Sequence, residues 1–151
     1  MTSEEIRAFI ARHVAAWAKH DVAGLMESYN DDCELVSPLF HIVRGKAAVE
    51  ESYREAFRIF GDVEVRLDDV LIDHDHPSGD KVAYTSTNTM THLGEVLGFP
   101  ATGRRFTLTG VFMLTFKDGR IASERRLYDL TEIMLQISSA RRSRQAPKDM
   151  N

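Results

Sequence analysis

The segment RFTLTGVFMLTFKDGRIASERRLYD, residues 105–129, decides the fold. Residues 105–116 are rich in β-branched and aromatic residues, which favour strands, and a second run follows from Arg120 to Asp129. Asp118 and Gly119 lie between them, and Asp-Gly between two such runs is the strongest short-range hairpin signal, because both residues accept positive φ. The sequence therefore predicts an antiparallel hairpin, followed directly by an apolar helix that begins at Leu130.

Helical patterns come before almost all of the other predicted strands. Apolar residues recur at helical spacing in residues 2–17, 21–29 and 46–60. From residue 62 the period changes to two, first over residues 62–72 and then over residues 82–92. Helices first and hairpin-linked strands afterwards predict an α+β fold, with an antiparallel sheet that curls over the helices.

Length and composition predict one domain, residues 1–138, and a flexible polar tail, residues 139–151. The net charge is -4 and the folded part has no basic stripe, so we expect neither nucleic acid nor a membrane surface as a partner. No apolar run approaches the roughly 20 residues of a membrane span, and no signal peptide is recognisable, which predicts a cytoplasmic protein. Cys33 is the one cysteine, and its acidic neighbours argue against a reactive thiolate.

Asp129 is the leading candidate for catalysis, because strand interiors disfavour aspartate and buried carboxylates are costly. In an apolar pocket, desolvation would raise its pKa towards that of a useful general base or acid. The alternative is structural: Asp129 followed by Glu132 matches the start of a helix, with Asp129 as the cap. Both interpretations stay open at this point.

His92 is the second catalytic candidate. It ends a predicted strand face that carries Tyr84 and Met90, and it leads into a glycine-rich loop, so it could orient a substrate oxygen or share a proton with a carboxylate. The alternative is a histidine with a purely structural hydrogen bond.

Aromatic side chains at helical or strand spacing are either core residues or the walls of a ligand cavity. Six of them are our candidates for substrate binding: Trp17, Tyr29, Tyr53, Phe57, Phe112 and Tyr128.

Three charged groups have a simpler interpretation. Residues 73–76, Asp-His-Asp-His, resemble metal ligands but lead into a Pro-Ser-Gly turn, so we predict no metal site. Arg66 and Asp68 have a spacing that could activate water, yet they are expected to face solvent. Arg125 and Arg126 are expected at the surface, although an arginine beside Asp129 would lower the pKa of that carboxyl.

Several segments together resemble the SnoaL-like polyketide cyclases of the nuclear-transport-factor-like superfamily. They are residues 16–29, 45–49, 91–105 and 116–121, then Tyr128, Asp129 and Gln136. The stretch that begins Thr-His-Leu-Gly-Glu at residue 91 and continues to Arg105 is the most specific of them. The resemblance covers roughly residues 4–138.

This resemblance implies a cone-shaped α+β barrel: three N-terminal helices packed in a curved antiparallel sheet of mixed strand order, with a short C-terminal helix, an apolar pocket and frequent homodimerisation. It also implies catalysis without metal or cofactor, in which Asp129 is the acid/base and His92 assists.

Two functions follow as hypotheses. The first is acid/base catalysis, such as aldol cyclisation or isomerisation, on a small hydrophobic carbonyl compound. The second is a dimeric module of the same fold that binds a small hydrophobic ligand without reacting with it. Epoxide or other hydrolysis would need an Asp-Arg-Asp group that the sequence does not assemble. Fold alone does not distinguish these functions.

Overall fold

The hairpin predicted from residues 105–129 lies within a six-stranded sheet. In the computed structural model, which describes residues 1–138, strands β5 (Arg105–Lys117) and β6 (Arg120–Leu127) pair antiparallel. Asp118 and Gly119 between them have φ values of 54° and 74°. The predicted hairpin and its turn chemistry are therefore confirmed. The predicted tail, residues 139–151, lies outside the described residues.

The remaining elements follow the predicted order of helices before strands. They are α1 (Ser3–Ala18), α2 (Val22–Glu27), β1 (Tyr29–Ser37), β2 (His41–Arg44), α3 (Lys46–Ile59), β3 (Phe60–Asp73), β4 (Lys81–His92) and the C-terminal helix α4 (Leu130–Ile137).

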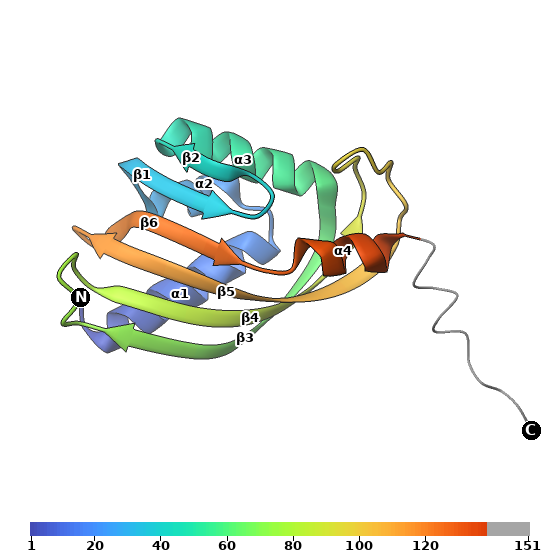
Figure 1. Ribbon diagram of the computed structural model, residues 1–151. Helices are drawn as coiled ribbons and strands as arrows, with labels where there is room; N and C mark the ends of the chain where they lie inside the picture. Colours follow the sequence, from blue (N-terminus) through green and yellow to red (C-terminus); the bar gives the residue numbers. More distant parts are fainter. Residues whose placement is uncertain (139–151) are drawn as a thin grey trace, which may run out of the picture.

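The sheet is curved, α1 and α3 pack on one of its faces, and α4 lies beside the end of β5 (Figure 1). The strand order is β2-β1-β6-β5-β4-β3. All neighbouring strands are antiparallel except β1 and β6, which are parallel. The α+β class, the three N-terminal helices, the mixed strand order and the short last helix are thus confirmed. The sheet was expected to be wholly antiparallel, but it is not, because β1 lies parallel to β6.

Strand β4 directs alternate side chains towards the helices, as predicted. Val82, Tyr84, Ser86 and Asn88 are each at most 4% exposed, because successive side chains of a strand point to opposite faces. The threonines between them lie on the outer face of the sheet. The inner face therefore brings two polar groups, Ser86 and Asn88, into the interior.

Strand β6 contains a bulge that changes which of its residues point inwards. Phe116 pairs with Ile121, but the next pair is Thr115 with Ser123, so Ala122 is an extra residue. An extra residue moves the following side chains to the opposite face. As a result Glu124 and Arg126 are buried, and Leu127 is 48% exposed. The expectation that Arg126 lies at the surface was therefore wrong.

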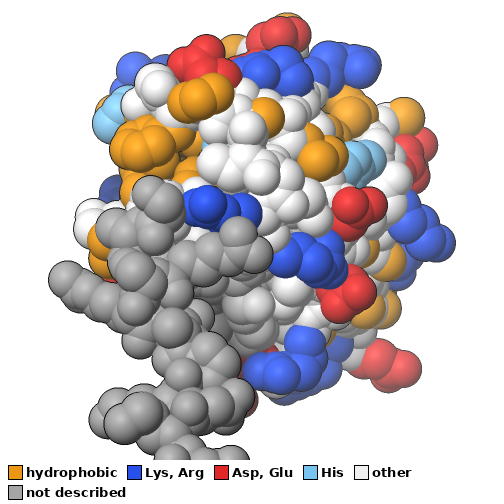
Figure 2. Space-filling model, turned by 90° about the vertical axis from the view of Figure 1, so that its right-hand side faces the viewer, with side chains coloured by type: hydrophobic (Ala, Val, Ile, Leu, Met, Phe, Trp, Pro, Cys, Tyr) orange, Lys and Arg blue, Asp and Glu red, His pale blue; other side chains and the backbone are white. Residues whose placement is uncertain are grey.

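The end of the molecule that carries α4 and the loop of residues 93–104 shows hydrophobic side chains among charged ones (Figure 2). Leu93, Leu97 and Phe99 of this loop are more than two-fifths exposed.

Within residues 1–138, no helix has the length and apolar character needed to cross a membrane.

Candidate functional site

A cavity lies between the inner face of the sheet and the helices. The empty space, including the open mouth, amounts to about 770 Å³. Apolar side chains from α1, α3, α4 and the strands form most of its wall. The polar residues in the lining include His13, Tyr53, Ser86, Asn88, Glu124 and Arg126.

Glu124 and Arg126 form a buried ion pair at this wall. They are two residues apart beyond the bulge of β6, so both side chains point inwards. Arg126 Nε donates to Glu124 Oε1 at 2.7 Å, and the two residues are 8% and 2% exposed. The Arg126 guanidinium also lies over the Tyr53 ring, 4.8 Å from the ring centre, a cation–π arrangement. Two charges are thus held inside an apolar interior, each with the other as its partner.

Hydroxyl groups extend this pair into a chain across three further elements. Tyr29 of β1 donates its hydroxyl proton to Glu124 Oε2. The Tyr29 and Tyr53 hydroxyls are 2.7 Å apart, and Tyr53 of α3 lies 3.5 Å from His13 Nε2 of α1. His13 Nδ1 is buried and has no hydrogen-bond partner among the described residues. The chain therefore ends at a ring nitrogen of a cavity-lining side chain.

Burial and charge set the protonation states of these groups. Burial raises the pKa of Glu124, but the charge of Arg126 and the hydrogen bonds from Arg126 and Tyr29 outweigh it, so that pKa lies below its ordinary value. Burial lowers the pKa of His13 to about 4. Burial raises the pKa of Tyr53 above its ordinary value. At neutral pH the site therefore holds a carboxylate, a guanidinium, a neutral imidazole and neutral phenols.

A second polar group lies on the β4 side of the cavity. Trp17 Nε1 donates to Asn88 Oδ1 at 3.1 Å, and Asn88 Nδ2 donates to Ser86 Oγ at 3.0 Å. An amide carries two N–H donors, so these contacts fix the Asn88 side chain and leave one of its N–H groups for another acceptor.

The structure brings four of the six predicted aromatic residues to the cavity: Trp17, Tyr53, Phe112 and Tyr128. Tyr29 is fully buried behind the wall, where it reaches Glu124. Phe57 is not among the lining residues; it packs against Trp17 and stacks on His20, with ring centres 5.0 and 4.1 Å apart.

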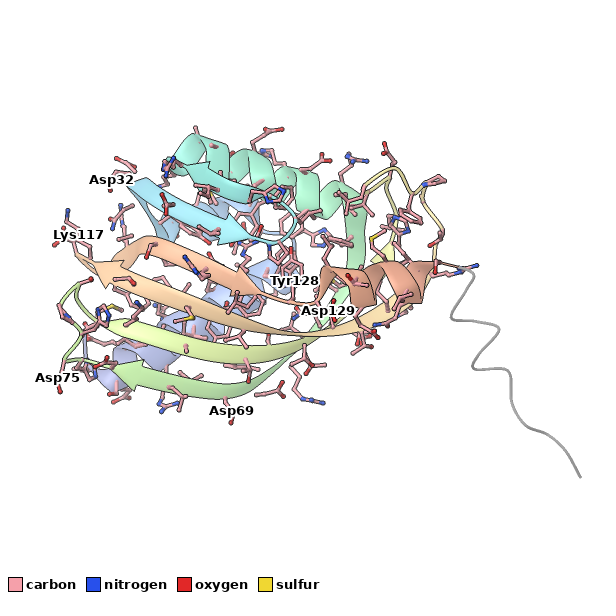
Figure 3. The ribbon with its side chains drawn as sticks, in the orientation of Figure 1. Asp32, Asp69, Asp75, Lys117, Tyr128 and Asp129 are labelled. Carbon is pink, nitrogen blue, oxygen red and sulfur yellow. The ribbon has the colours of Figure 1, made fainter. Side chains whose placement is uncertain are left out.

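Asp129 does not lie in the cavity. It is exposed at the first turn of α4 (Figure 3), and its Oδ1 accepts the backbone N–H of Glu132 at 3.1 Å. Asp129 is therefore not surrounded by apolar side chains, and its geometry corresponds to the helix cap that the sequence also allowed.

His92 is buried but likewise lies outside the cavity lining. Its Nδ1 is 2.9 Å from Thr102 Oγ1, and its backbone N–H donates to Arg104 O. These contacts tie the two ends of the 93–104 loop together, which matches the structural alternative for His92.

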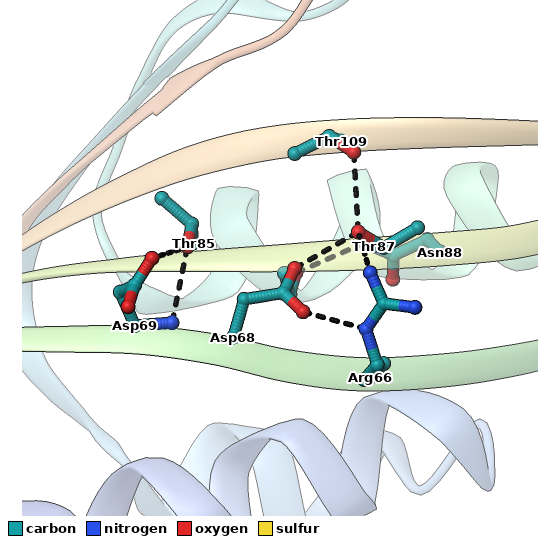
Figure 4. A network of polar contacts seen from close by, with 8 residues as sticks. Arg66, Asp68, Asp69, Thr85, Thr87, Asn88 and Thr109 are labelled. Atoms are coloured by element: carbon teal, nitrogen blue, oxygen red, sulfur yellow. Dashed lines mark hydrogen bonds and ion pairs between the residues drawn. The ribbon is translucent and has the colours of Figure 1, made fainter.

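Arg66 and Asp68 lie on the outer face of the sheet, as predicted. Arg66 Nε is 2.6 Å from Asp68 Oδ1, and Thr87 donates to Asp68 Oδ2 at 2.9 Å (Figure 4). Both charged residues are exposed and do not reach the cavity.

In the loop after β3, His74 Nδ1 is 2.8 Å from Asp80. Residues 1–138 contain no group of three or more His, Cys, Asp or Glu side chains placed to hold a metal ion.

Comparison with known families agrees with this architecture. The family model of the SnoaL-like domain matches residues 10–124. The chain belongs to the SnoaL-like domain family. The match covers most of α1 and extends to Glu124, so it includes His13, Tyr29 and Tyr53. Asp129 and α4 lie beyond the end of the match. A search of curated proteins finds no relative of this SnoaL-like protein.

Solved structures show the same fold at low sequence identity. A candidate SnoaL-like polyketide cyclase from Jannaschia sp. CCS1 is 20% identical, with a TM-score of 0.79, over 90% of this chain and 93% of that one. AclR, a candidate hydroxylase from Streptomyces galilaeus, is 24% identical, with a TM-score of 0.76, over 90% and 97%. TerC, co-crystallised with polyporic acid, is 20% identical, with a TM-score of 0.71, over 91% and 100%.

Replacing Asp129 with Ala tests its place as a helix cap. The variant loses the hydrogen bond to the Glu132 N–H, so we expect the free energy of unfolding to fall by about 0.5–2 kcal/mol. Ligand affinity should stay within twofold of the wild type. Urea denaturation and calorimetric titration measure the two quantities. An unchanged or higher stability together with lost activity would instead favour a catalytic Asp129.

Acidification tests the burial of His13. Its pKa is about 4 in the folded protein and about 6.5 in an unfolded chain, so between these values the unfolded chain binds a proton that the folded one excludes. The free energy of unfolding therefore falls as the pH falls through this window. Between pH 7 and pH 4.5, His13→Gln should lose about 2 kcal/mol less than the wild type.

The control for that comparison is His41→Asn, which removes an exposed histidine at positive φ, a conformation that asparagine tolerates. The control should follow the wild type through the same pH range. If His13→Gln also follows the wild type, His13 is not buried in its neutral form.

Proposed function

We propose that this SnoaL-like protein binds a small hydrophobic carbonyl compound in the cavity and catalyses proton transfer next to the carbonyl group, as in aldol cyclisation or isomerisation. The observation that carries the proposal is the buried chain of His13, Tyr53, Tyr29, Glu124 and Arg126 at the wall of an otherwise apolar cavity. Titratable groups with shifted pKa values in a cavity are typical of acid/base sites.

Each side of the cavity has a separate part in this proposal. The apolar wall holds the body of the compound and excludes water, which strengthens every electrostatic interaction inside. The Arg126 guanidinium stabilises negative charge that develops on the carbonyl oxygen when a neighbouring proton leaves. The free N–H of Asn88 supplies a neutral donor to an oxygen of the compound. The proposed chemistry moves only protons.

We therefore assign the acid/base role to the buried chain at the cavity wall, here called the cavity cluster, in place of Asp129 and His92. The cavity cluster consists of His13, Tyr53, Tyr29, Glu124 and Arg126. Asp129 is exposed and His92 is bonded to the loop, whereas the cavity cluster is at most 8% exposed. TerC, which has the same fold, was co-crystallised with polyporic acid, and this supports a small molecule as the ligand of the present fold.

A binding module without catalysis is the second candidate, and one observation favours it. Glu124 already accepts protons from Arg126 and Tyr29 in hydrogen bonds, so its carboxylate is not free to take a proton directly from a ligand. Exchange of a ligand's α-hydrogens separates the two functions, because binding alone leaves them in place. Homodimerisation is part of either proposal, and light scattering of the purified protein tests it.

Filling the cavity tests the proposed site. Ala56 of α3 is 3% exposed and lines the cavity, so Ala56→Leu places a larger apolar side chain in empty space. We expect the affinity for β-tetralone, a small hydrophobic ketone, to fall at least about tenfold. Quenching of Trp17, the one tryptophan of the chain, reports binding.

The matched control is Ala48→Leu, the same substitution on the exposed side of α3, which should leave the affinity within twofold of the wild type. The cavity also predicts that Ala56→Leu keeps the thermal stability close to the wild type, whereas a close-packed site would lose about 1–3 kcal/mol. Equal affinities for both variants would place the ligand elsewhere.

A further inference from the structure

The hydrogen-bond chain behind the cavity has one direction. A phenol carries a single proton, and that of Tyr29 is donated to Glu124. At the 2.7 Å contact between the two tyrosines, Tyr53 must therefore be the donor. With its own proton used in this way, the Tyr53 oxygen meets His13 Nε2, 3.5 Å away, as an acceptor. His13 consequently carries its proton on Nε2.

The other ring nitrogen of His13 is therefore an unoccupied acceptor. A neutral imidazole has one N–H, so Nδ1 holds a lone pair. This atom is buried without a hydrogen-bond partner among residues 1–138, although a buried polar atom that lacks a partner is costly. His13 is one of the cavity-lining residues, so a proton taken from a bound compound would give Nδ1 the missing partner.

We propose that His13 Nδ1 takes the proton from the bound compound and that Tyr53 and Tyr29 relay an equivalent proton to Glu124. This inference rests on the proposed function. As Nδ1 gains the proton of the compound, the Nε2 proton moves to the Tyr53 oxygen, the Tyr53 proton to Tyr29, and the Tyr29 proton to the Glu124 carboxylate. No other bond forms or breaks. His13 ends neutral with its proton on Nδ1, and the compound ends as an enolate.

Charge balance in the cavity then defines the class of substrate. Before the transfer, the positive charge of Arg126 is balanced by Glu124. Afterwards Glu124 is neutral, and Arg126 is free to pair with the new negative charge on the compound. The buried charge stays zero throughout, which avoids the cost of an uncompensated ion. A neutral, enolisable compound fits this balance, whereas a carboxylate would bring a second negative charge to a site that is already neutral.

The side chains that face His13 come from three other elements and from its own helix. Tyr53 comes from α3, Tyr29 from β1 with its ring centre 5.8 Å from that of His13, and Glu124 and Arg126 from β6. On its own helix, Phe9 stacks on the imidazole. Glu124 is the only carboxylate of this group, so it is where the relayed proton ends.

Two measurements test the relay. Nitrogen-15 NMR of the wild type at pH 7 should show His13 as the neutral tautomer protonated on Nε2. Proton NMR in heavy water then follows exchange of the α-hydrogens of β-tetralone. Tyr29→Phe breaks the chain between Tyr53 and Glu124, so we expect exchange to slow about 100-fold, with the affinity for β-tetralone within threefold of the wild type.

Ser52→Ala is the matched control. It removes another buried hydroxyl from α3, next to Tyr53 in sequence. The Ser52 hydroxyl donates to the Val49 carbonyl and is not part of the chain to Glu124. Its exchange rate should stay within twofold of the wild type.

Different results overturn the two proposals. A His13 tautomer protonated on Nδ1, an imidazolium at pH 7, or undiminished exchange in Tyr29→Phe would overturn the relay and leave the proposed function in place. Absence of exchange when the wild type has bound β-tetralone would overturn the catalytic function, and the relay with it. The tautomer measurement needs no variant, so the relay stays testable even if Tyr29→Phe does not fold.

Discussion

The ion pair between Glu124 and Arg126 is the interaction on which the interior of this protein depends. Both charges are buried, and removing one partner of such a pair typically costs about 3–5 kcal/mol, because the other charge is left uncompensated. The pair therefore needs its surroundings: Tyr29 from β1 donates to the carboxylate, and the Tyr53 ring from α3 lies against the guanidinium. The pair therefore connects β6 with β1 and with α3 at the polar wall of the cavity.

Much of the fold can be predicted from local patterns, because local rules dominate there. Asp118 and Gly119 adopt the positive φ values that their side chains permit, and the alternation of β4 gives the buried face that was expected. The pairing of β1 with β6 has no local signal, because the two strands are far apart in sequence. Cys33 and Leu35 indicate a strand, but not its neighbour.

The candidate site was harder to predict, and β6 shows why. Strict alternation from the buried Ile121 assigns Ser123 and Arg125 to the inner face. The extra residue, Ala122, reverses this assignment and turns Glu124 and Arg126 inwards. Asp129 was predicted to be catalytic because it is a carboxylate at a strand end. In the structure it lies at the surface and accepts the Glu132 N–H as a helix cap. The aromatic residues of the cavity were easier to predict, because the helical or strand spacing of their sequence is kept in the structure. They are Trp17, Tyr53, Phe112 and Tyr128.

In the proposed mechanism, Glu124 stays ionised inside the protein until a bound compound gives a proton to the hydrogen-bond chain that ends at this carboxylate. Carbon-13 NMR of the Glu124 side-chain carboxyl, titrated between pH 8 and pH 5 and assigned with Glu124→Gln, tests this most directly. We predict the chemical shift of an ionised carboxylate throughout, because Arg126 and the two donated hydrogen bonds keep its pKa below the ordinary value. A titration within this range, or a protonated carboxyl at pH 7, would contradict the account.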